Sequence, residues 1–193
     1  MRIIAGTLKG RRLVTPRGST TRPTADQVRI ALMDTLAPYL PGARFLDLFA
    51  GAGGVGLEAL SRGAARAVLV DREANALAAL RRNITALGLE AQTRVVRGDV
   101  ERALALLAAE GERFDLVFLD PPYDTDLADA ALARLGGDAV TAPGAIVVAQ
   151  HFTKRPPRDA VGVLAAFRTR RFGETTLTFF RAGAYDARTR GGV

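Results

Sequence analysis

The stretch Asp120-Pro121-Pro122-Tyr123 carries the side chains best suited to chemistry, and it directly follows the apolar residues 116–119. That run has the composition of a strand buried on both faces, and the prolines end it because they fix φ and donate no backbone hydrogen bond. Open α/β sheets bind ligands at the carboxyl ends of their strands. A carboxylate and a carbonyl there can accept hydrogen bonds from an amino group, and a tyrosine ring can stack on a planar base. The stretch therefore suits a planar, amino-bearing substrate such as a nucleobase; the alternative is a strand-to-loop turn with a surface tyrosine.

A glycine loop with the spacing G-x-G-x-x-G, formed by Gly51, Gly53 and Gly56, follows a predicted strand at residues 44–49 and opens a predicted helix. Such a turn lets the backbone approach a ligand closely and exposes a helix N-terminus. Asp71 lies 20 residues beyond Gly51, at the end of the next predicted strand. An acid at that point can hold the two hydroxyls of a ribose. A nicotinamide enzyme and a nucleoside-binding methyltransferase both fit this pattern.

Asp47 helps to separate these two classes, because it lies inside the first predicted strand, just before the glycine loop. A carboxylate at this point would repel a pyrophosphate. It suits a ligand with ammonium and sulfonium charges, such as S-adenosylmethionine. The alternative is a buried acid that caps a neighbouring loop.

Strands alternate with helices through the middle of the chain, which predicts a parallel, doubly wound α/β sheet. An acid falls near the carboxyl end of four of the predicted strands, so we expect four carboxylates along one edge of the sheet. These acids are Asp47, Asp71, Asp99 and Asp120. The predicted strands are residues 44–49, 67–70, 93–97, 116–119 and 145–149, and the predicted helices are 55–61, 73–87, 100–109 and 127–135.

The two ends of the chain have a different pattern. Residues 2–14 predict a small β-hairpin, in which Lys9, Arg11 and Arg12 could bind phosphates. A helix is expected to open near Arg22, so that Arg22, Arg29 and the helix N-terminus face a ligand-bearing surface; a plain helix packed on the sheet explains the segment equally well. Two β-rich runs predict an antiparallel hairpin at the sheet edge. These runs are residues 167–172 and 175–180.

These patterns divide the chain into three parts. We expect residues 1–21 to form a phosphate-contacting β-hairpin extension and loop, residues 22–183 to form the catalytic domain, and residues 184–193 to form a disordered tail. No role is assigned to residues 154–167.

The composition excludes several classes of site. The 193 residues include no cysteine and one histidine, which excludes disulfides, thiolate nucleophiles and metal sites built from cysteine or several histidines. The net charge of +7 is concentrated in residues 1–30 and 151–193, whereas residues 31–150 are acidic. Basic flanks suggest contact with a polyanion; the alternative is solubilising charge. No signal peptide or long apolar run is present, so we expect a cytoplasmic protein without membrane contact.

Taken together, the chain resembles the RsmD family, the bacterial methyltransferases of guanine N2 in 16S ribosomal RNA. The resemblance covers nearly the whole chain. The matching motifs are Met1-Arg2-Ile3-Ile4-Ala5-Gly6 with Gly10-Arg11, Arg22-Pro23-Thr24 with Asp26 and Val28-Arg29, Leu46-Asp47-Leu48-Phe49-Ala50-Gly51-Ala52-Gly53, Gly56-Leu57-Glu58-Ala59-Leu60-Ser61-Arg62-Gly63, and Asp120-Pro121-Pro122-Tyr123.

The resemblance implies a class I, S-adenosylmethionine-dependent fold with a seven-stranded, mostly parallel sheet. It also implies a monomer without metal whose substrate is small-subunit rRNA in the assembled 30S particle. The implied guanine-binding residues are Asp120, Pro121 and Tyr123. The implied cofactor-binding residues are Asp47, Gly51 and Gly53 around the methionine part, Asp71 at the ribose, and Asp99 with Val100 at the adenine. Phe49 is also expected to contact the cofactor. The RNA-binding residues are expected to be Lys9, Arg11, Arg12 and Arg22.

Three alternatives remain open from the sequence. The first is a DNA adenine-N6 or cytosine-N4 methyltransferase, because the same acidic Pro-Pro-Tyr stretch serves those amines. Such enzymes usually carry an added recognition region, for which this chain has little room. The second is a nicotinamide-dependent oxidoreductase. The third is a catalytically silent RNA-binding module.

Overall fold

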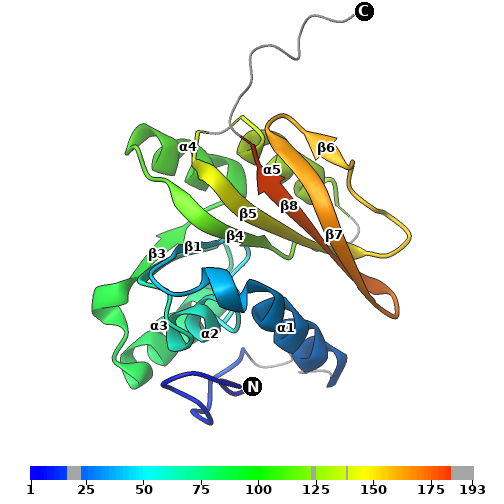
Figure 1. The fold of residues 1–193 in the computed structure, drawn as a ribbon. Helices are drawn as coiled ribbons and strands as arrows, with labels where there is room; N and C mark the ends of the chain where they lie inside the picture. Colours follow the sequence, from blue (N-terminus) through cyan, green and yellow to red (C-terminus); the bar gives the residue numbers. More distant parts are fainter. Residues whose placement is uncertain (17–22, 123–124, 138, 184–193) are drawn as a thin grey trace, which may run out of the picture.

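The structure, a computed structural model, describes residues 1–16, 23–122, 125–137 and 139–183 (Figure 1). Within these ranges, eight strands form one sheet in the order β3-β2-β1-β4-β5-β8-β7-β6. Their bounds are β1 Arg44–Asp47, β2 Arg66–Asp71, β3 Thr93–Arg97, β4 Phe114–Leu119, β5 Thr141–Phe152, β6 Ala160–Val161, β7 Leu164–Phe172 and β8 Thr175–Ala182.

The first five strands of the chain are parallel, and the last three are added to β5 in antiparallel pairs. In the centre, Leu46 of β1 lies opposite Val68 of β2 on one side and Val117 of β4 on the other. The chain therefore leaves β1 in one direction towards β2 and returns on the other side at β4. Ligands bind at this kind of switch point in open α/β sheets.

Helices cover both faces of the sheet: α1, α2 and α3 lie on one side, and α4 and α5 on the other (Figure 1). Neighbouring strand residues enter separate cores, because side chains alternate between the faces of a strand. Phe45 packs with the first group of helices, and Leu46 packs with the second. The helix bounds are α1 Pro23–Leu36, α2 Gly56–Ser61, α3 Ala74–Leu87, α4 Val100–Ala109 and α5 Leu127–Leu135, with 3₁₀ turns at Ala37–Tyr39 and Glu90–Gln92.

The predicted N-terminal hairpin folds back on itself with little strand structure. Residues 2–12 contain one antiparallel bridge, between Arg2 and Arg12, and the Ile3 amide donates to the Arg11 carbonyl at 2.9 Å. Ile3 is fully buried, and it joins the core on the α1–α3 side of the sheet together with Leu13. The segment is thus packed into the domain that follows it.

The sheet has one strand more than the seven that the sequence predicts. The additional strand, β6, has two residues and pairs with the start of β7 across Gly162. Two residues are too few to give a detectable alternation of apolar and polar side chains. The predicted strand at residues 145–149 is the buried middle of the longer β5.

Two predicted segments, the loop at residues 17–21 and the tail at residues 184–193, lie outside the described residues. In the rest of the chain, no helix is long and apolar enough to cross a membrane.

Candidate active site

A cavity of about 430 Å³ lies at the carboxyl ends of the central strands. Its walls come from the segments that follow β1, β2, β3 and β4. The structure therefore brings together residues that are far apart in the sequence, as predicted. Six of the predicted site residues line this cavity: Phe49, Asp71, Asp99, Val100, Asp120 and Pro121.

A second cavity, of about 260 Å³, adjoins the first. Phe49 and Asp120 line both cavities, so these two residues lie between them. The predicted residues Asp47 and Gly51 line the second cavity, together with Arg29 of α1. The two cavities form one site that can hold an elongated ligand across the sheet edge.

The glycine loop between β1 and α2 folds closely against its surroundings. Gly53 has a φ of +89°, and a Cβ on it would lie 2.6 Å from the Leu80 side chain. A Cβ on Gly56 would lie 2.2 Å from the Leu69 side chain. Gly53 adopts a φ that L side chains rarely adopt, and a side chain at either position would require the neighbouring Leu side chains to move.

Asp47 lies almost completely buried at the end of β1, where its Oδ2 accepts a hydrogen bond from the Gly56 N–H at 3.1 Å. Its Oδ1 has no hydrogen-bond partner in the described part of the chain. Burial raises the pKa of Asp47 to about 7, the N–H groups of Gly56 and Phe49 oppose this rise, and the charge of Asp120 adds to it. The Phe49 contact lies outside hydrogen-bond geometry, so Oδ1 is an acceptor without a donor. A buried carboxylate of this kind fits a cationic donor such as an ammonium group.

Asp71 and Asp99 hold the backbone as well as lining the cavity. Asp71 accepts hydrogen bonds from the Gly51 N–H at 2.7 Å and from the Glu73 N–H at 2.8 Å. Asp99 is the N-cap of α4, where its side chain accepts from the Arg102 N–H at 3.0 Å. Each carboxylate oxygen can accept a further hydrogen bond. The predicted contacts of Asp71 with ribose and of Asp99 with adenine remain predictions.

Asp120 lies directly after β4, at the corner formed by Pro121 and Pro122. Burial raises the pKa of Asp120 to about 7. The Thr125 hydroxyl donates to the Pro122 carbonyl at 2.7 Å. Tyr123, the third predicted catalytic residue, lies outside the described residues.

The predicted RNA-binding residues are only partly positioned by the fold. Lys9 and Arg12 are exposed, whereas Arg11 donates from Nη2 to the Ala86 carbonyl at the end of α3, at 2.5 Å. Arg22 lies outside the described residues. The fold therefore fixes Arg11 against the end of α3 and leaves Lys9 and Arg12 exposed.

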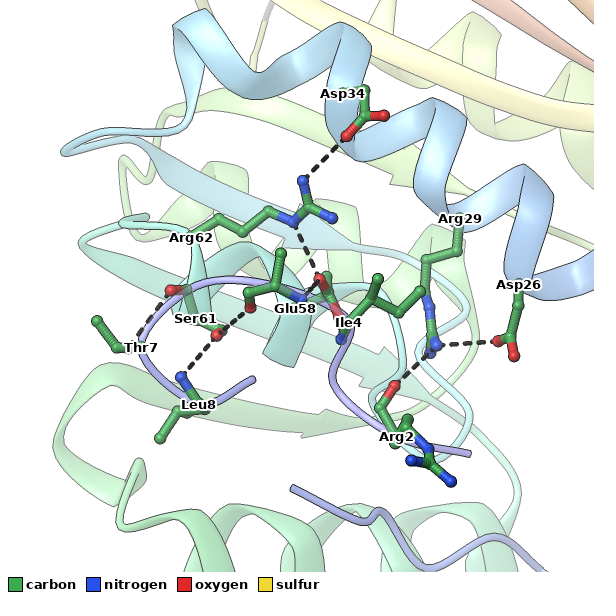
Figure 2. Close-up of polar contacts among 11 residues, drawn as sticks. Arg2, Ile4, Thr7, Leu8, Asp26, Arg29, Asp34, Glu58, Ser61 and Arg62 are labelled. Atoms are coloured by element: carbon green, nitrogen blue, oxygen red, sulfur yellow. Dashed lines mark hydrogen bonds and ion pairs between the residues drawn. The ribbon is translucent and has the colours of Figure 1, made fainter. Parts of the chain in front are cut away.

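No role was predicted for Glu58, which fixes the N-terminal segment against α2 (Figure 2). Glu58 is fully buried, and its carboxylate accepts from the Ile4 N–H at 2.7 Å, the Ala5 N–H at 2.9 Å and the Arg62 Nε–H at 2.9 Å. Arg62 also pairs with Asp34 of α1 at 3.2 Å. The sequence feature that could have indicated this role is an acidic residue inside a short helix whose other residues are mostly apolar. This network affects the site because it fixes the N-terminal segment, whose first residue, Met1, lines the second cavity.

Comparisons with known proteins decide the family. A family model described as conserved hypothetical protein 95 matches residues 1–181. The chain belongs to this family. It is 37% identical to the "Putative rRNA methyltransferase YlbH" of Bacillus subtilis over 94% of this chain and 98% of the relative. It is also 37% identical to "Ribosomal RNA small subunit methyltransferase D" of Escherichia coli, over 76% of this chain and 72% of the relative.

A solved structure extends this finding to the fold. The "Putative methyltransferase yhhF from Escherichia coli" superposes with a TM-score of 0.84 at 32% identity, covering 95% of this chain and 98% of that chain. The family resemblance in the sequence is confirmed, and the fold is that of class I methyltransferases.

Proposed function

We propose that this protein transfers the methyl group of S-adenosylmethionine to the exocyclic N2 amine of a guanine in small-subunit rRNA, within the assembled 30S particle. The observation that carries the proposal is the position of Asp120. Asp120 is partly exposed, and its carboxyl group stands directly after β4, beside the Pro-Pro corner and between the two cavities. The names of the relatives from B. subtilis and E. coli support rRNA as the substrate.

The site residues fit the proposed donor. The larger cavity has room for a nucleoside next to Phe49, with Asp71 at the ribose and Asp99 and the Val100 backbone at the adenine. The smaller cavity holds the free Oδ1 of Asp47, which suits the ammonium group of the methionine part. Gly51 leaves the loop backbone open to this part of the ligand, because nothing in the described part of the chain lies within 4 Å of the place where its Cβ would be. Gly53 lines neither cavity, and it faces Leu57 and Leu80 of the core instead.

Asp120 and the Pro121 carbonyl activate the target amine. The amine is a poor nucleophile because its lone pair is delocalised into the guanine ring. Hydrogen bonds from its N–H groups to these two acceptors localise the lone pair and aim it at the methyl group. The bound donor supplies a methyl on a sulfonium sulfur, which leaves as a neutral thioether. As the N–C bond forms and the S–C bond breaks, an amine proton passes to Asp120 or to water.

A pKa near 7 suits Asp120 for this step, because its ionised form can accept a proton at neutral pH. Tyr123 is expected to stack on the guanine once the base has left its helical context. The carboxylate of Asp47 next to the glycine loop disfavours the pyrophosphate of a nicotinamide cofactor.

The proposal is tested by tritiated methyl transfer from S-adenosylmethionine to unmethylated small subunits, to naked 16S rRNA and to DNA, followed by nucleoside analysis. We expect N2-methylguanosine, and more of it from the assembled subunits than from naked rRNA. Label in methyladenine or methylcytosine of the DNA alone would replace the proposal with the DNA methyltransferase alternative.

A further inference from the structure

The strands β7 and β8, at the end of the sheet beyond β5, are rich in arginine (Figure 1). Within their bounds they contain four arginines and no acid, and Glu174 lies in the turn between them. In the described part of the chain, none of these arginines forms an ion pair, whereas Arg62 and Arg94 each pair with two acids. Their charge is therefore available to a polyanion. The arginines are Arg168, Arg170, Arg171 and Arg181.

Arg181 of β8 lies beside two exposed aromatic rings. The central carbon of its guanidinium group is 5.3 Å from the ring centroid of Phe167 and 5.7 Å from that of Tyr39. Its Nη2 also donates to the Tyr39 hydroxyl at 3.3 Å. Phe167 is 48% exposed and Tyr39 is 44% exposed. These contacts restrain the guanidinium group without burying it, so its charge and its flat face stay open to solvent.

A β-bulge in β7 accounts for the position of the Phe167 ring. Ala166 lies opposite Phe180 and Arg168 lies opposite Phe179, so Phe167 is the extra residue between the two pairs. A bulge changes the direction in which a side chain points. The Phe167 ring contacts that of Phe179, which is buried in the core on the α1 side of the sheet, with 6.3 Å between the ring centroids. The bulge thus places an aromatic ring beside Arg181 on this face.

The same face continues along β7 towards the active-site edge of the sheet. Arg170 lies opposite Leu177 of β8, which in turn lies opposite Gln150 of β5, a residue that lines the smaller cavity. The Arg170 guanidinium group is 5.7 Å from the Phe172 ring centroid, and its Nη1 donates to the Ala31 carbonyl of α1 at 3.2 Å. Three strand spacings, about 14 Å, separate β7 from β4, which leads into the Pro-Pro corner.

These side chains form one surface, which we call the arginine–aromatic surface. Its chemistry fits single-stranded RNA, because arginines pair with phosphates, and aromatic rings and guanidinium planes stack on unpaired bases. A duplex hides the faces of its bases and offers its phosphates alone. The surface consists of Tyr39, Phe167, Arg168, Arg170, Phe172 and Arg181.

We propose that the arginine–aromatic surface binds the unpaired RNA strand next to the target guanine. Bases stack on the rings of Tyr39 and Phe167, and Arg168 pairs with a phosphate. The inference rests on the proposed function and names a second RNA contact for it, on the other flank of the active site from the N-terminal segment. It orients the substrate and takes no part in the methyl transfer.

Equilibrium binding of the full chain to a single-stranded oligouridylate of about 12 nucleotides, and to an A·U duplex of the same length, tests the inference. Phe167→Leu keeps an apolar side chain against Phe179 and removes the exposed ring. Its affinity for the single strand should fall by about 5- to 100-fold, the range for loss of one base–aromatic stack. Its affinity for the duplex should change by less than about twofold, because a duplex has no exposed base face to lose.

Two arginine variants separate stacking from charge. Arg181→Lys keeps the charge and loses the planar group, so single-strand affinity should fall while its dependence on salt stays the same. Arg168→Gln should instead reduce the slope of log affinity against log salt by about 0.7 unit for one lost phosphate contact. Arg134→Gln is the matched control, because this exposed arginine belongs to α5 on the other face of the sheet (Figure 1). It should keep both wild-type values.

Wild-type affinity for the single strand in both Phe167→Leu and Arg181→Lys would overturn the inference, and so would equal losses for single strand and duplex. Variants that bind RNA normally but bind small subunits weakly would overturn it too, because a protein of the particle would then occupy the surface. Wild-type affinity for S-adenosylmethionine reports that each variant folds, since neither residue lines the two cavities. Should Phe167→Leu not fold, Tyr39→Leu is judged by the same criteria. A wild type that methylates no small subunits would overturn the proposed function instead.

Discussion

Asp47 ends β1, Asp120 directly follows the neighbouring parallel strand β4, and both residues line one cavity. Asp47 lies opposite Phe118 in the β1–β4 pair, two residues before Asp120. Burial is the main cause that raises the pKa of each to about 7, and the charge of Asp120 raises the pKa of Asp47 further. Folding thus opposes the ionisation of both acids, and a cationic ligand favours it. The form that binds the donor has both acids ionised, and without a ligand this form destabilises the folded protein.

Asp47→Asn should change how stability depends on pH. The folded pKa of Asp47, about 7, is above its unfolded value, so the folded state binds more protons between about pH 4 and 7. The neutral form of Asp47 stabilises the folded protein fully below about pH 4, and this stabilisation is lost as pH rises through 7. The variant does not show this loss. Relative to wild type, its free energy of unfolding should therefore rise by up to about 4 kcal/mol between pH 4 and pH 8.

Urea unfolding at both pH values measures this gain, and donor binding should weaken in the same variant. The exposed Asp129 of α5 supplies the control, because Asp129→Asn should shift stability equally at both pH values. A gain in Asp47→Asn that is equal at pH 4 and pH 8 would contradict the assigned ionisation.

Asp120→Asn should remove turnover and keep donor binding. The amide cannot accept the proton of the target amine, so we expect a decrease of about 10²- to 10⁴-fold in kcat, the range for loss of a general base. The dissociation constant of the donor should change by less than about threefold, because Asp120 contacts the substrate amine in this mechanism. Methyl transfer to unmethylated small subunits measures the first quantity, and calorimetry measures the second.

Asp115→Asn is the control for this variant. Asp115 lies at the opposite end of β4, where it accepts from the Arg44 N–H at 2.8 Å, and its loss should leave kcat unchanged. In wild type, kcat should rise with pH through about 7 as Asp120 ionises. Wild-type turnover in Asp120→Asn would exclude this mechanism.

The residues of the site were predictable because their signals are local. Asp71 and Asp120 each follow an apolar run, and Asp47 lies inside one, just before the glycine loop. The parallel sheet brings the carboxyl ends of these strands to one edge. The predicted roles of Asp71 and Asp99 were incomplete, because their bonds to nearby backbone N–H groups leave no mark in the sequence. The side chains of Glu58 and Arg29 form hydrogen bonds with residues more than 25 positions away in the sequence. Their burial follows from the tertiary fold, which periodicity does not describe.

Glu58→Gln should loosen the N-terminal segment. Glutamine has one acceptor oxygen in place of two. Its amide N–H₂ group would therefore face a backbone N–H that now donates a hydrogen bond to the Glu58 carboxylate. We expect a loss of about 2–4 kcal/mol in the free energy of unfolding, as for a buried charged acceptor. Hydrogen exchange should rise first at the amides of Ile4 and Ala5, and Glu101→Gln on the exposed side of α4 should change neither measurement. Unchanged protection of these two amides would show that other contacts hold the segment.

Lys9 and Arg12 should contribute to RNA affinity in a manner that depends on salt. Both side chains are exposed on the N-terminal segment. Each phosphate contact that is removed should reduce the slope of log affinity against log salt concentration by roughly one unit. Binding of Lys9→Ala and Arg12→Ala to small subunits, titrated between about 50 and 200 mM salt, measures this slope. Arg94→Gln is the control, because Arg94 already pairs with Glu110 through two hydrogen bonds. If wild-type affinity does not vary with salt, the basic N-terminal segment does not bind a polyanion. If both Lys9→Ala and Arg12→Ala keep the wild-type slope, the phosphate contacts lie elsewhere on the chain.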